Sequence, residues 1–151
     1  MTLAYGLITN YDLTAKIGTA LSSNTWTYKE LGAGIDNISE ALNEVVQQYH
    51  FLDDDGFARN HVTGMSPAFT LTGKRVIGDD AQDYIFGKKY DLDGDRVSSF
   101  QLSYKPTSST TTTITCDCTI CNIQEFSGAS TDDTSISFEI RFDGEPTVAT
   151  A

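Results

Sequence analysis

The sequence predicts a mainly β protein: a β-sandwich or small barrel flanked by one short α-helix, with long loops and flexible termini. Residues 97–105, 112–123 and 135–142 alternate apolar with polar side chains, which is typical of strands with one buried face. Such strands must pack against each other to bury their apolar faces. The chain has 151 residues, the length of one domain. We therefore expect residues 1–151 to form a single domain.

The N-terminal part, residues 1–24, has weak periodicity, which predicts an irregular arm or a short first strand. Residues 25–31 then alternate, with Trp26 and Tyr28 on the same face, and a pair of glycines follows. This pattern predicts a strand, and we expect Trp26 to lie in the core.

Two interpretations are open for residues 35–52. One is a helix, because apolar residues recur at helical spacing. The other is a short strand at 35–38, a loop at 39–44 and a strand at 45–52. Periodicity alone leans slightly to the helix. The apolar residues at helical spacing are Ile38, Leu42, Val45, Val46 and Tyr49.

A turn and a further strand are expected next. The run from Asp53 to Gly56 is a turn signal, since the glycine can adopt a left-handed conformation. Residues 65–76 predict a strand with Phe69 and Leu71 on one face. Pro67 lacks an amide hydrogen, so the strand is expected to begin there or to lie at a sheet edge.

One short helix is predicted after this strand. Asp79 can cap its N-terminus, and Gln82 stands three positions later in a capping-box arrangement. Tyr84 and Ile85 fall on one side of the helix. Gly87 is a natural C-terminal stop.

The last three strands supply much of the expected core. Their polar faces carry Asp117, Glu139 and Arg141. The tail at 147–151 follows a proline and is expected to be flexible. The predicted core residues are Phe69, Leu71, Tyr84, Ile85, Ile114, Ile136, Phe138 and Ile140.

The net negative charge of the chain disfavours binding to nucleic acid. There are 21 acidic and 10 basic residues, giving a net charge of −11 and a pI near 4.3. Proteins that bind DNA contact its phosphates with clustered lysines and arginines.

No apolar stretch approaches the roughly 20 residues that span a bilayer. The N-terminus lacks the basic region and apolar core of a signal peptide, so we expect the protein to stay in the cytoplasm at least until assembly.

The cysteines and acidic runs give no case for a metal or cofactor. Cys116 and Cys118 share a strand face and are expected to be small buried hydrophobes, with Cys121 on the other face. The two histidines, His50 and His61, lack paired ligand spacing. The Asp91–Asp95 run departs from the calcium-loop pattern and is expected to be a hairpin turn before Val97.

Nothing in the sequence predicts catalysis. A nucleophile needs a neighbouring base and an orienting third group, and no such motif stands out. The chain has neither a Gly-x-Ser-x-Gly turn nor a phosphate-cradling glycine loop. We therefore expect no enzyme activity. The rival interpretation is a hydrolase whose catalytic carboxylates do not stand out in the sequence.

The order of motifs between residues 25 and 90 resembles the major tail tube proteins of siphophages. An aromatic strand and an acidic-glycine turn occupy 45–57, and Val-Thr-Gly-Met follows at 62–65. Phe-Thr-Leu-Thr-Gly-Lys-Arg stands at 69–75, and Gly-Asp-Asp-Ala-Gln-Asp-Tyr-Ile-Phe at 78–86. Each motif alone is an ordinary turn, strand or helix signal, and their order carries the resemblance. The type VI secretion tube protein is similar in fold.

This resemblance implies a structural subunit of a bacteriophage tail tube, assembled in the host cytoplasm and located in the virion tail. Hexameric rings would stack into a hollow conduit that passes viral DNA to the host without binding it. The partners implied are further copies of the chain, a tape measure protein, and tail terminator and baseplate proteins. The resemblance also favours the loop interpretation, with an inter-ring stacking loop made of Ser39, Glu40, Ala41, Leu42, Asn43 and Glu44.

The polar strand faces could line such a conduit. Asp117, Glu139 and Arg141 are candidates for the lumen, although alternation alone cannot tell the lumen from the outer surface. Six copies at −11 each would carry −66 per ring, so an acidic lumen would repel phosphates. The alternative function is a ligand- or sugar-binding β-sandwich module of a virion or baseplate, for which Trp26 and Tyr28 are the candidate aromatic patch.

Overall fold

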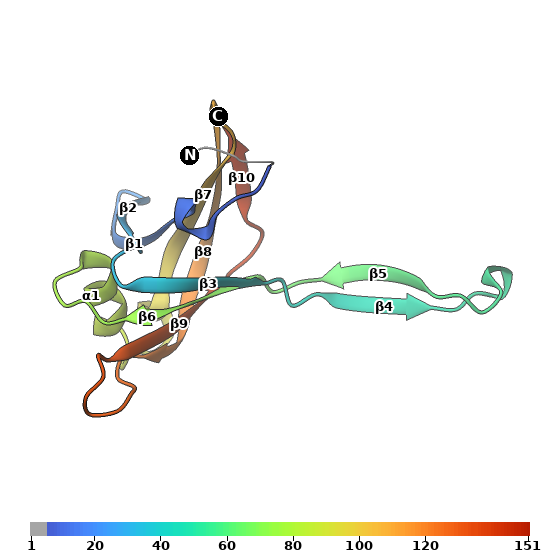
Figure 1. Ribbon diagram of the computed structural model, residues 1–151. Helices are drawn as coiled ribbons and strands as arrows, with labels where there is room; N and C mark the ends of the chain where they lie inside the picture. Colours follow the sequence, from blue (N-terminus) through green and yellow to red (C-terminus); the bar gives the residue numbers. More distant parts are fainter. Residues whose placement is uncertain (1–5) are drawn as a thin grey trace.

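The computed structural model describes residues 6–151, and it consists of a body and a long two-stranded arm that projects from it (Figure 1). The body combines a folded antiparallel sheet with one short helix, which confirms the mainly β fold class. Three short 3₁₀ turns complete the chain, at Asn10–Asp12, Leu52–Asp54 and Asp93–Arg96. The strands and the helix are β1 (Thr14–Ser22), β2 (Thr25–Glu30), β3 (Ile35–Ala41), β4 (Val45–Tyr49), β5 (Arg59–Gly64), β6 (Ala68–Lys74), α1 (Asp80–Gly87), β7 (Val97–Thr107), β8 (Thr110–Gln124), β9 (Ser135–Phe142) and β10 (Thr147–Thr150).

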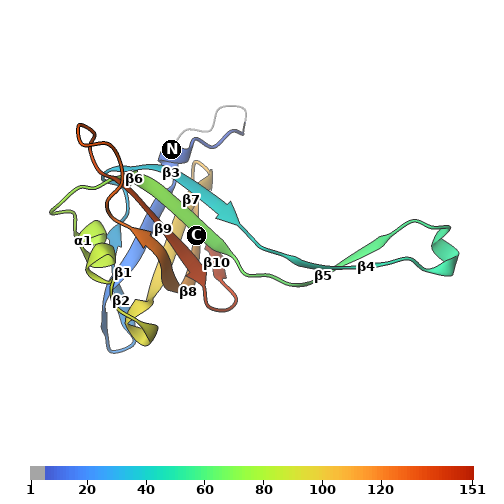
Figure 2. The same cartoon turned by 90° about the horizontal axis from the view of Figure 1, so that it is seen from below.

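The body sheet folds over on itself through its longest strand. Its strand order is β2-β1-β7-β8-β9-β6-β3, and β10 also pairs with β8. The first part of β8 pairs with β7 and the second part pairs with β9, so β8 belongs to both halves. The half that contains β3 and β6 crosses the half that contains β1 and β7 (Figures 1 and 2). The apolar faces of the two halves therefore enclose the core between them.

Alternating side chains from both halves fill this core, and α1 adds Ile85 and Phe86 to it. Six of the eight predicted core residues are buried as expected. Tyr84 and Ile114 are only partly buried, which corrects the prediction. Tyr84 lies under the Lys88 ammonium, 5.5 Å from its ring centroid. Ile114 lines a groove of about 390 Å³ where the two halves diverge.

Both ends of the described chain are more regular than the sequence suggests. β1 runs for nine residues between β2 and β7, with Ala15 and Ile17 buried. The expectation of a flexible tail is wrong, because β10 pairs with residues 112–115 of β8 and Ala151 exchanges two backbone hydrogen bonds with Thr111. Residues 112–115 of β8 pair with β7 on one side only, because the pairing with β9 begins at Cys118, and β10 occupies the other side. Residues 1–5 of the expected N-terminal arm lie outside the described residues.

The helical interpretation of residues 35–52 is wrong. Residues 35–41 form β3 and pair with β6, so their backbone groups bond across strands. The strand–loop–strand interpretation holds with shifted bounds: the strand continues to Ala41, and only residues 42–44 link it to β4. The segment before Val97 is likewise a 3₁₀ turn at Asp93–Arg96 that follows α1, where a hairpin turn was expected.

Candidate assembly surfaces

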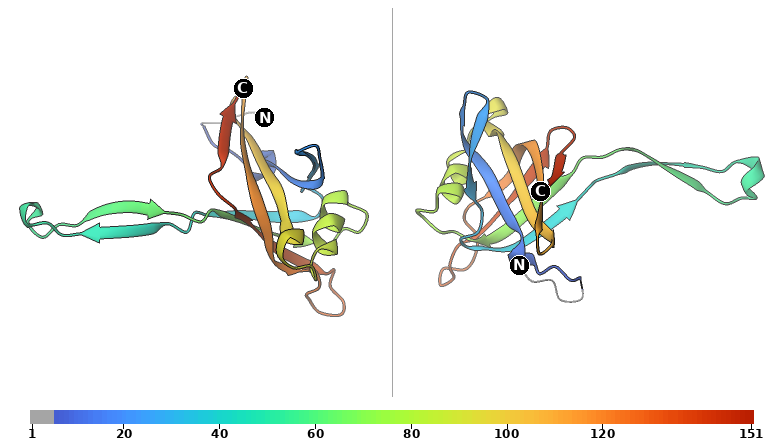
Figure 3. Two further views of the ribbon diagram at one scale, coloured as in Figure 1. Left: turned by 180° about the vertical axis from the view of Figure 1, so that it is seen from behind. Right: turned by 90° about the horizontal axis from the view of Figure 1, so that it is seen from above.

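The arm, residues 42–66, is the most exposed feature of the molecule and projects on the side away from α1 (Figure 3). Its strands β4 and β5 pair only with each other, with Val46 opposite Val62 and Tyr49 opposite Arg59. Nearly every residue in both strands is exposed. A two-stranded ribbon on its own is marginally stable in water. The exposed apolar side chains of the arm are Leu42, Val45, Val46, Tyr49, Phe51, Leu52, Phe57, Val62 and Met65.

The tip of the arm is acidic and apolar. A 3₁₀ turn at Leu52–Asp54 leads into Asp55 and Gly56, both with positive φ (53° and 86°), which confirms the predicted turn. The Arg59 guanidinium donates two hydrogen bonds to the Asp54 carboxylate, at 2.7 and 2.9 Å. This ion pair therefore holds the turn in place, while the apolar side chains Leu52 and Phe57 stay exposed.

The base of the arm is closed by hydrogen bonds across the two strands. Ser66 N–H donates to the Leu42 carbonyl, and the Asn43 side chain donates to the Ser66 carbonyl, both at 2.9 Å. Asn43 itself adopts a positive φ of 50°. The six residues predicted as a stacking loop therefore divide: Ser39, Glu40 and Ala41 belong to β3, and Leu42, Asn43 and Glu44 form the base of the arm.

The outward face of β3, β6, β9 and the end of β8 forms a second candidate surface, here called the polar face. Side chains at alternate positions of these strands point away from the core, and the registers align them in rows across the sheet. Most of them are small hydroxyl or amide side chains. The rows are Gln124–Ser137–Thr72–Asn37, Cys121–Glu139–Thr70–Ser39 and Thr119–Arg141–Ala68–Ala41.

The cations of the polar face have hydrogen-bond partners, and one of them is ion-paired. The Arg141 Nε donates to the Glu139 carboxylate, which raises the pKa of Arg141. Asn122 donates to the other Glu139 oxygen at 3.4 Å. Lys74 donates to the Ser135 hydroxyl at 2.8 Å and to the Asp133 carbonyl at 3.3 Å. Both cations of the face therefore have partners.

Asp117 lies at the margin of this face. It is exposed on β8, and its carbonyl accepts from Asp143 N–H at 2.8 Å. The Asp143 carboxylate accepts a 2.6 Å hydrogen bond from the Thr119 hydroxyl. The structure therefore brings Glu139 and Arg141 together and sets Asp117 apart from them, beside a second carboxylate.

The polar face has an open edge on each side. β3 is the last strand of the sheet order, so its outer edge has no neighbour among the described residues. The ladder between β7 and β8 begins at Thr119, and the later residues of β8 have only β9 beside them within residues 6–151. Arg96 donates to the Ile120 carbonyl at this edge at 3.0 Å. Exposed backbone groups at such edges invite pairing with another strand.

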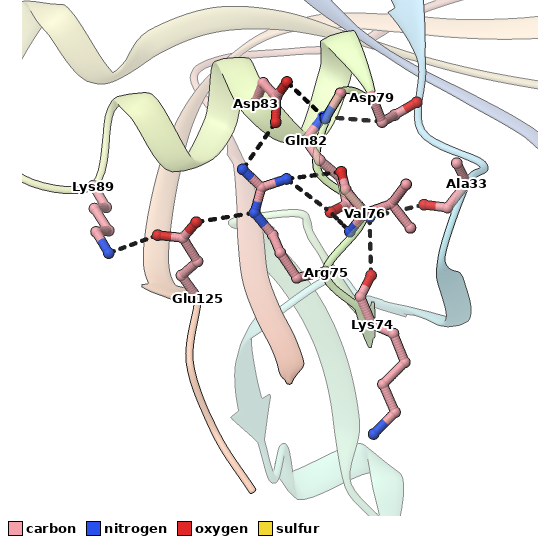
Figure 4. Close-up of polar contacts among 10 residues, drawn as sticks. Ala33, Lys74, Arg75, Val76, Asp79, Gln82, Asp83, Lys89 and Glu125 are labelled. Carbon is pink, nitrogen blue, oxygen red and sulfur yellow. Dashed lines mark hydrogen bonds and ion pairs between the residues drawn. The ribbon is translucent and has the colours of Figure 1, made fainter. Parts of the chain in front are cut away.

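A polar network anchors α1 to the end of β6 (Figure 4). Arg75 donates to Glu125 and to Asp83, both at 2.9 Å, and Lys89 donates to Glu125 at 2.6 Å. The hydrogen bond from Lys89 is the main cause that lowers the pKa of Glu125 below its ordinary value. This network was not predicted, because the participants lie up to fifty residues apart in the chain.

Asp79 caps α1 as predicted, since its carboxylate accepts from Gln82 N–H at 3.1 Å. The Gln82 side chain does not complete a capping box. It is fully buried, donates to the carbonyls of Ala33 (2.8 Å) and Lys74 (3.1 Å), and accepts from Val76 N–H at 2.8 Å. The Gln82 amide thus bonds to three backbone groups that lack strand partners. Completing the capping box would give it only one such bond.

Trp26 and Tyr28, the candidate aromatic patch, are both held against the sheet. The Trp26 indole is half-buried on the outward side of β1 over Gly18, where a Cβ would stand 2.7 Å from the ring. The expectation that Trp26 lies in the core is therefore wrong. The Tyr28 hydroxyl hydrogen-bonds with the Ser99 hydroxyl at 2.8 Å. One face of the Trp26 ring therefore packs on Gly18, and the Tyr28 hydroxyl is bonded within the sheet.

Cys116 and Cys118 are buried as expected, and burial raises the pKa of both thiols. Within the described part of the chain, no group of three or more His, Cys, Asp or Glu side chains is placed to hold a metal ion. Among residues 6–151, no helix is long and apolar enough to cross a bilayer.

No protein-family model matches the sequence, and neither does any curated protein. Solved structures share the fold across nearly the whole chain, and they include the following three. A chain in the tail of the empty gene transfer agent particle, computed with C6 symmetry, aligns with a TM-score of 0.72 and 14% identity over 95% of this chain and 99% of its own. A chain in the virion of the native gene transfer agent particle gives 0.69 and 16% over the same shares.

The anti-feeding prophage cap, which terminates that particle's tube, aligns with a TM-score of 0.60 and 14% identity over 100% of this chain and 95% of its own. At these identities the likeness shows the fold. The protein therefore has the fold found in the tails of gene transfer agent particles and in the tube-terminating cap of the anti-feeding prophage.

Proposed function

We propose that the protein is a structural subunit of a phage-type tail tube, in which hexameric rings of this chain stack into a hollow conduit for DNA. The arm is the observation that carries this proposal. It is a two-stranded ribbon with apolar side chains on its surface and no third strand beside it among the described residues. Such a ribbon needs a partner surface to be stable, and further copies of the chain are the partner that a tube supplies.

Ring closure would use the two open edges of the polar face. The outer edge of β3 in one copy would pair with the end of β8 in the next, which would satisfy the exposed backbone groups of both. A heterologous contact of this kind closes when the rotation between copies divides a full turn. The C6 symmetry of the similar gene transfer agent tail supports six copies.

Stacking of rings would use the arm. Residues 42–44 set its direction from the end of β3, and the apolar side chains from Val45 to Phe57 would be buried against the adjacent ring. This assignment keeps Leu42, Asn43 and Glu44 from the predicted stacking loop as the base of the contact. It places Ser39, Glu40 and Ala41 in β3, where they would support ring closure.

The polar face would line the lumen. Glu139 and Arg141 would point inward from each copy, with Asp117 near the margin. Six copies would carry −66 per ring, a charge that opposes DNA binding within a Debye length of about 8 Å. The role is structural and not catalytic. Its further partners would be a tape measure protein inside the tube and terminator and baseplate proteins at its ends, in the virion tail.

Negative-stain microscopy of the purified chain tests this proposal. The wild type should form rings or tubes with a central channel. A variant in which a two-residue Asn-Gly turn replaces residues 45–64 should remain folded and monomeric, because the arm contributes little to the body core. Tubes of normal appearance from this variant would contradict the stacking role. A wild-type chain that stays a single subunit at every concentration and salt condition would refute the proposal itself.

A further inference from the structure

We propose that Glu139 masks Arg141, so that this guanidinium of the polar face is not free to bind DNA. The inference rests on the proposed function, because it concerns the face that would line the lumen. The ion pair between Glu139 and Arg141 would let a polyanion pass this surface without being bound. Glu139 is a positioning residue in this proposal, and Arg141 is the group that would otherwise bind phosphate.

The positive charges of the face carry the argument. Among the residues described for its four strands, Lys74 and Arg141 are the cations whose side chains lie on this side of the sheet. Lys74 is turned to the Ser135 hydroxyl and the Asp133 carbonyl. Arg141 donates to the Glu139 carboxylate. The rest of the face is mostly Ser, Thr, Asn and Gln, which carry no charge.

Arg141 is the group that most needs a partner at this position. A guanidinium presents a planar fork of N–H donors that matches a phosphate, and it stays charged at every physiological pH. About half of its side chain is exposed (52%), so it could reach a passing strand. Each phosphate neutralised by such a group releases counterions and adds affinity that falls steeply with salt. Repeated in every copy, a free Arg141 would hold DNA at many points.

Strand geometry keeps Glu139 close to Arg141. The two residues stand two positions apart on the same face of β9, which separates their Cα atoms by about 7 Å. The carboxylate therefore stays near the guanidinium even when the hydrogen bond between them opens. Asn122 donates to the second Glu139 oxygen and holds the carboxylate on the face. The negative charge of Glu139 then offsets the positive charge of Arg141, so a phosphate that passes the sheet meets a neutral pair.

Retention of a short fluorescent DNA duplex by sedimented tubes tests the inference. Wild-type tubes should retain almost none. Glu139→Gln tubes should retain about tenfold more at about 20 mM salt, and the excess should disappear at about 200 mM. The double variant Glu139→Gln/Arg141→Gln should return to the wild-type level, because the unmasked cation is then gone. Asp95→Asn, which removes one exposed carboxylate outside the face, should also behave as wild type.

The outcomes separate this inference from the proposed function. Absence of tubes in the wild type would count against the proposed function. Normal Glu139→Gln tubes that retain no more duplex than wild type would overturn the masking role, as would equal retention by Asp95→Asn. Where Glu139→Gln does not assemble alone, mixed tubes with wild-type chains should retain duplex in proportion to the variant fraction. Exclusion of the variant from mixed tubes would also overturn the inference, because it would make Glu139 an assembly residue.

Discussion

Gly73 of β6 and Gly34, which precedes β3, approach so closely that neither position has room for a side chain. A Cβ on Gly73 would stand 2.8 Å from the Cα of Ile35 and closer still to the Gly34 carbonyl. The Lys74 N–H donates to that carbonyl at 2.7 Å. The beginning of the polar face is therefore set by two backbones in direct contact.

Gly73→Ala should destabilise the protein by about 3 kcal/mol, because the new methyl group meets backbone that cannot turn aside. Urea unfolding of the monomer measures this change. Gly94→Ala is the matched control, since a Cβ there meets nothing within 4 Å, and its effect should stay within about 0.5 kcal/mol. Equal stability of the two variants would show that β3 and β6 can move apart without cost.

Gln82→Met, which keeps the side-chain volume, should cost about 3 kcal/mol in the same assay. The substitution leaves the Val76 N–H and the Ala33 and Lys74 carbonyls without their partner on the buried Gln82 side chain. Gln124→Met on the exposed end of β8 serves as the control and should be close to neutral. A small effect at Gln82 would mean that water replaces the amide.

Asp79→Ala should lower the unfolding free energy by about 1 kcal/mol through loss of the helix cap. Asp79→Ser should recover most of that loss, because a serine hydroxyl can accept the same hydrogen bond from Gln82 N–H. Thermal unfolding of the three proteins in parallel measures the difference. If the serine variant is as unstable as the alanine variant, the cap is not the source of the effect.

The Glu125 network should make stability depend on pH in the acid range. The folded-state pKa of Glu125 lies below its ordinary value of 4.5. Its contribution is therefore present above that value and lost as the pH falls through the folded-state pKa. The stability difference between wild type and Glu125→Gln should be largest near neutral pH and shrink on acidification. Glu145→Gln removes an exposed carboxylate, and the difference measured for it should not shrink in the same way.

The apolar tip of the arm should matter for association and not for folding. Leu52→Ser and Phe57→Ser replace side chains that are exposed in the single chain, so their unfolding curves should match wild type within about 0.5 kcal/mol. Their tube formation, followed by light scattering, should need a higher protein concentration. Unchanged assembly would remove the tip from the proposed stacking contact.

Much of the body could be predicted from the sequence, because strands with one buried face show it in their alternation. The pattern from Ile136 to Phe142 predicted β9, and Asp79 predicted the start of α1. The buried apolar side chains of β1, Ala15 and Ile17, are too few to give the same signal, and β10 is all exposed. Such strands form because they pair with the open edge of a neighbouring strand, and a single sequence does not show which edges are open.

The candidate surfaces were harder to predict for a related reason. The arm is exposed on both faces, so its side chains obey no inside–outside rule, and a helical spacing from Ile38 to Tyr49 could arise without a helix. The pairing of Glu139 with Arg141 needed only strand alternation to place both on one face. The partners of Glu125 and Gln82 come from distant parts of the chain, and only the folded sheet brings them together.

The isolated position of the arm has a kinetic consequence. A ribbon that is only marginally stable by itself loses conformational freedom when it docks, and that entropic cost falls on the first association event. Later subunits would meet a growing end whose arms are already immobilised. Assembly would therefore begin with a lag and then proceed by rapid elongation, so that pre-formed seeds, more than protein concentration, would determine how many particles form.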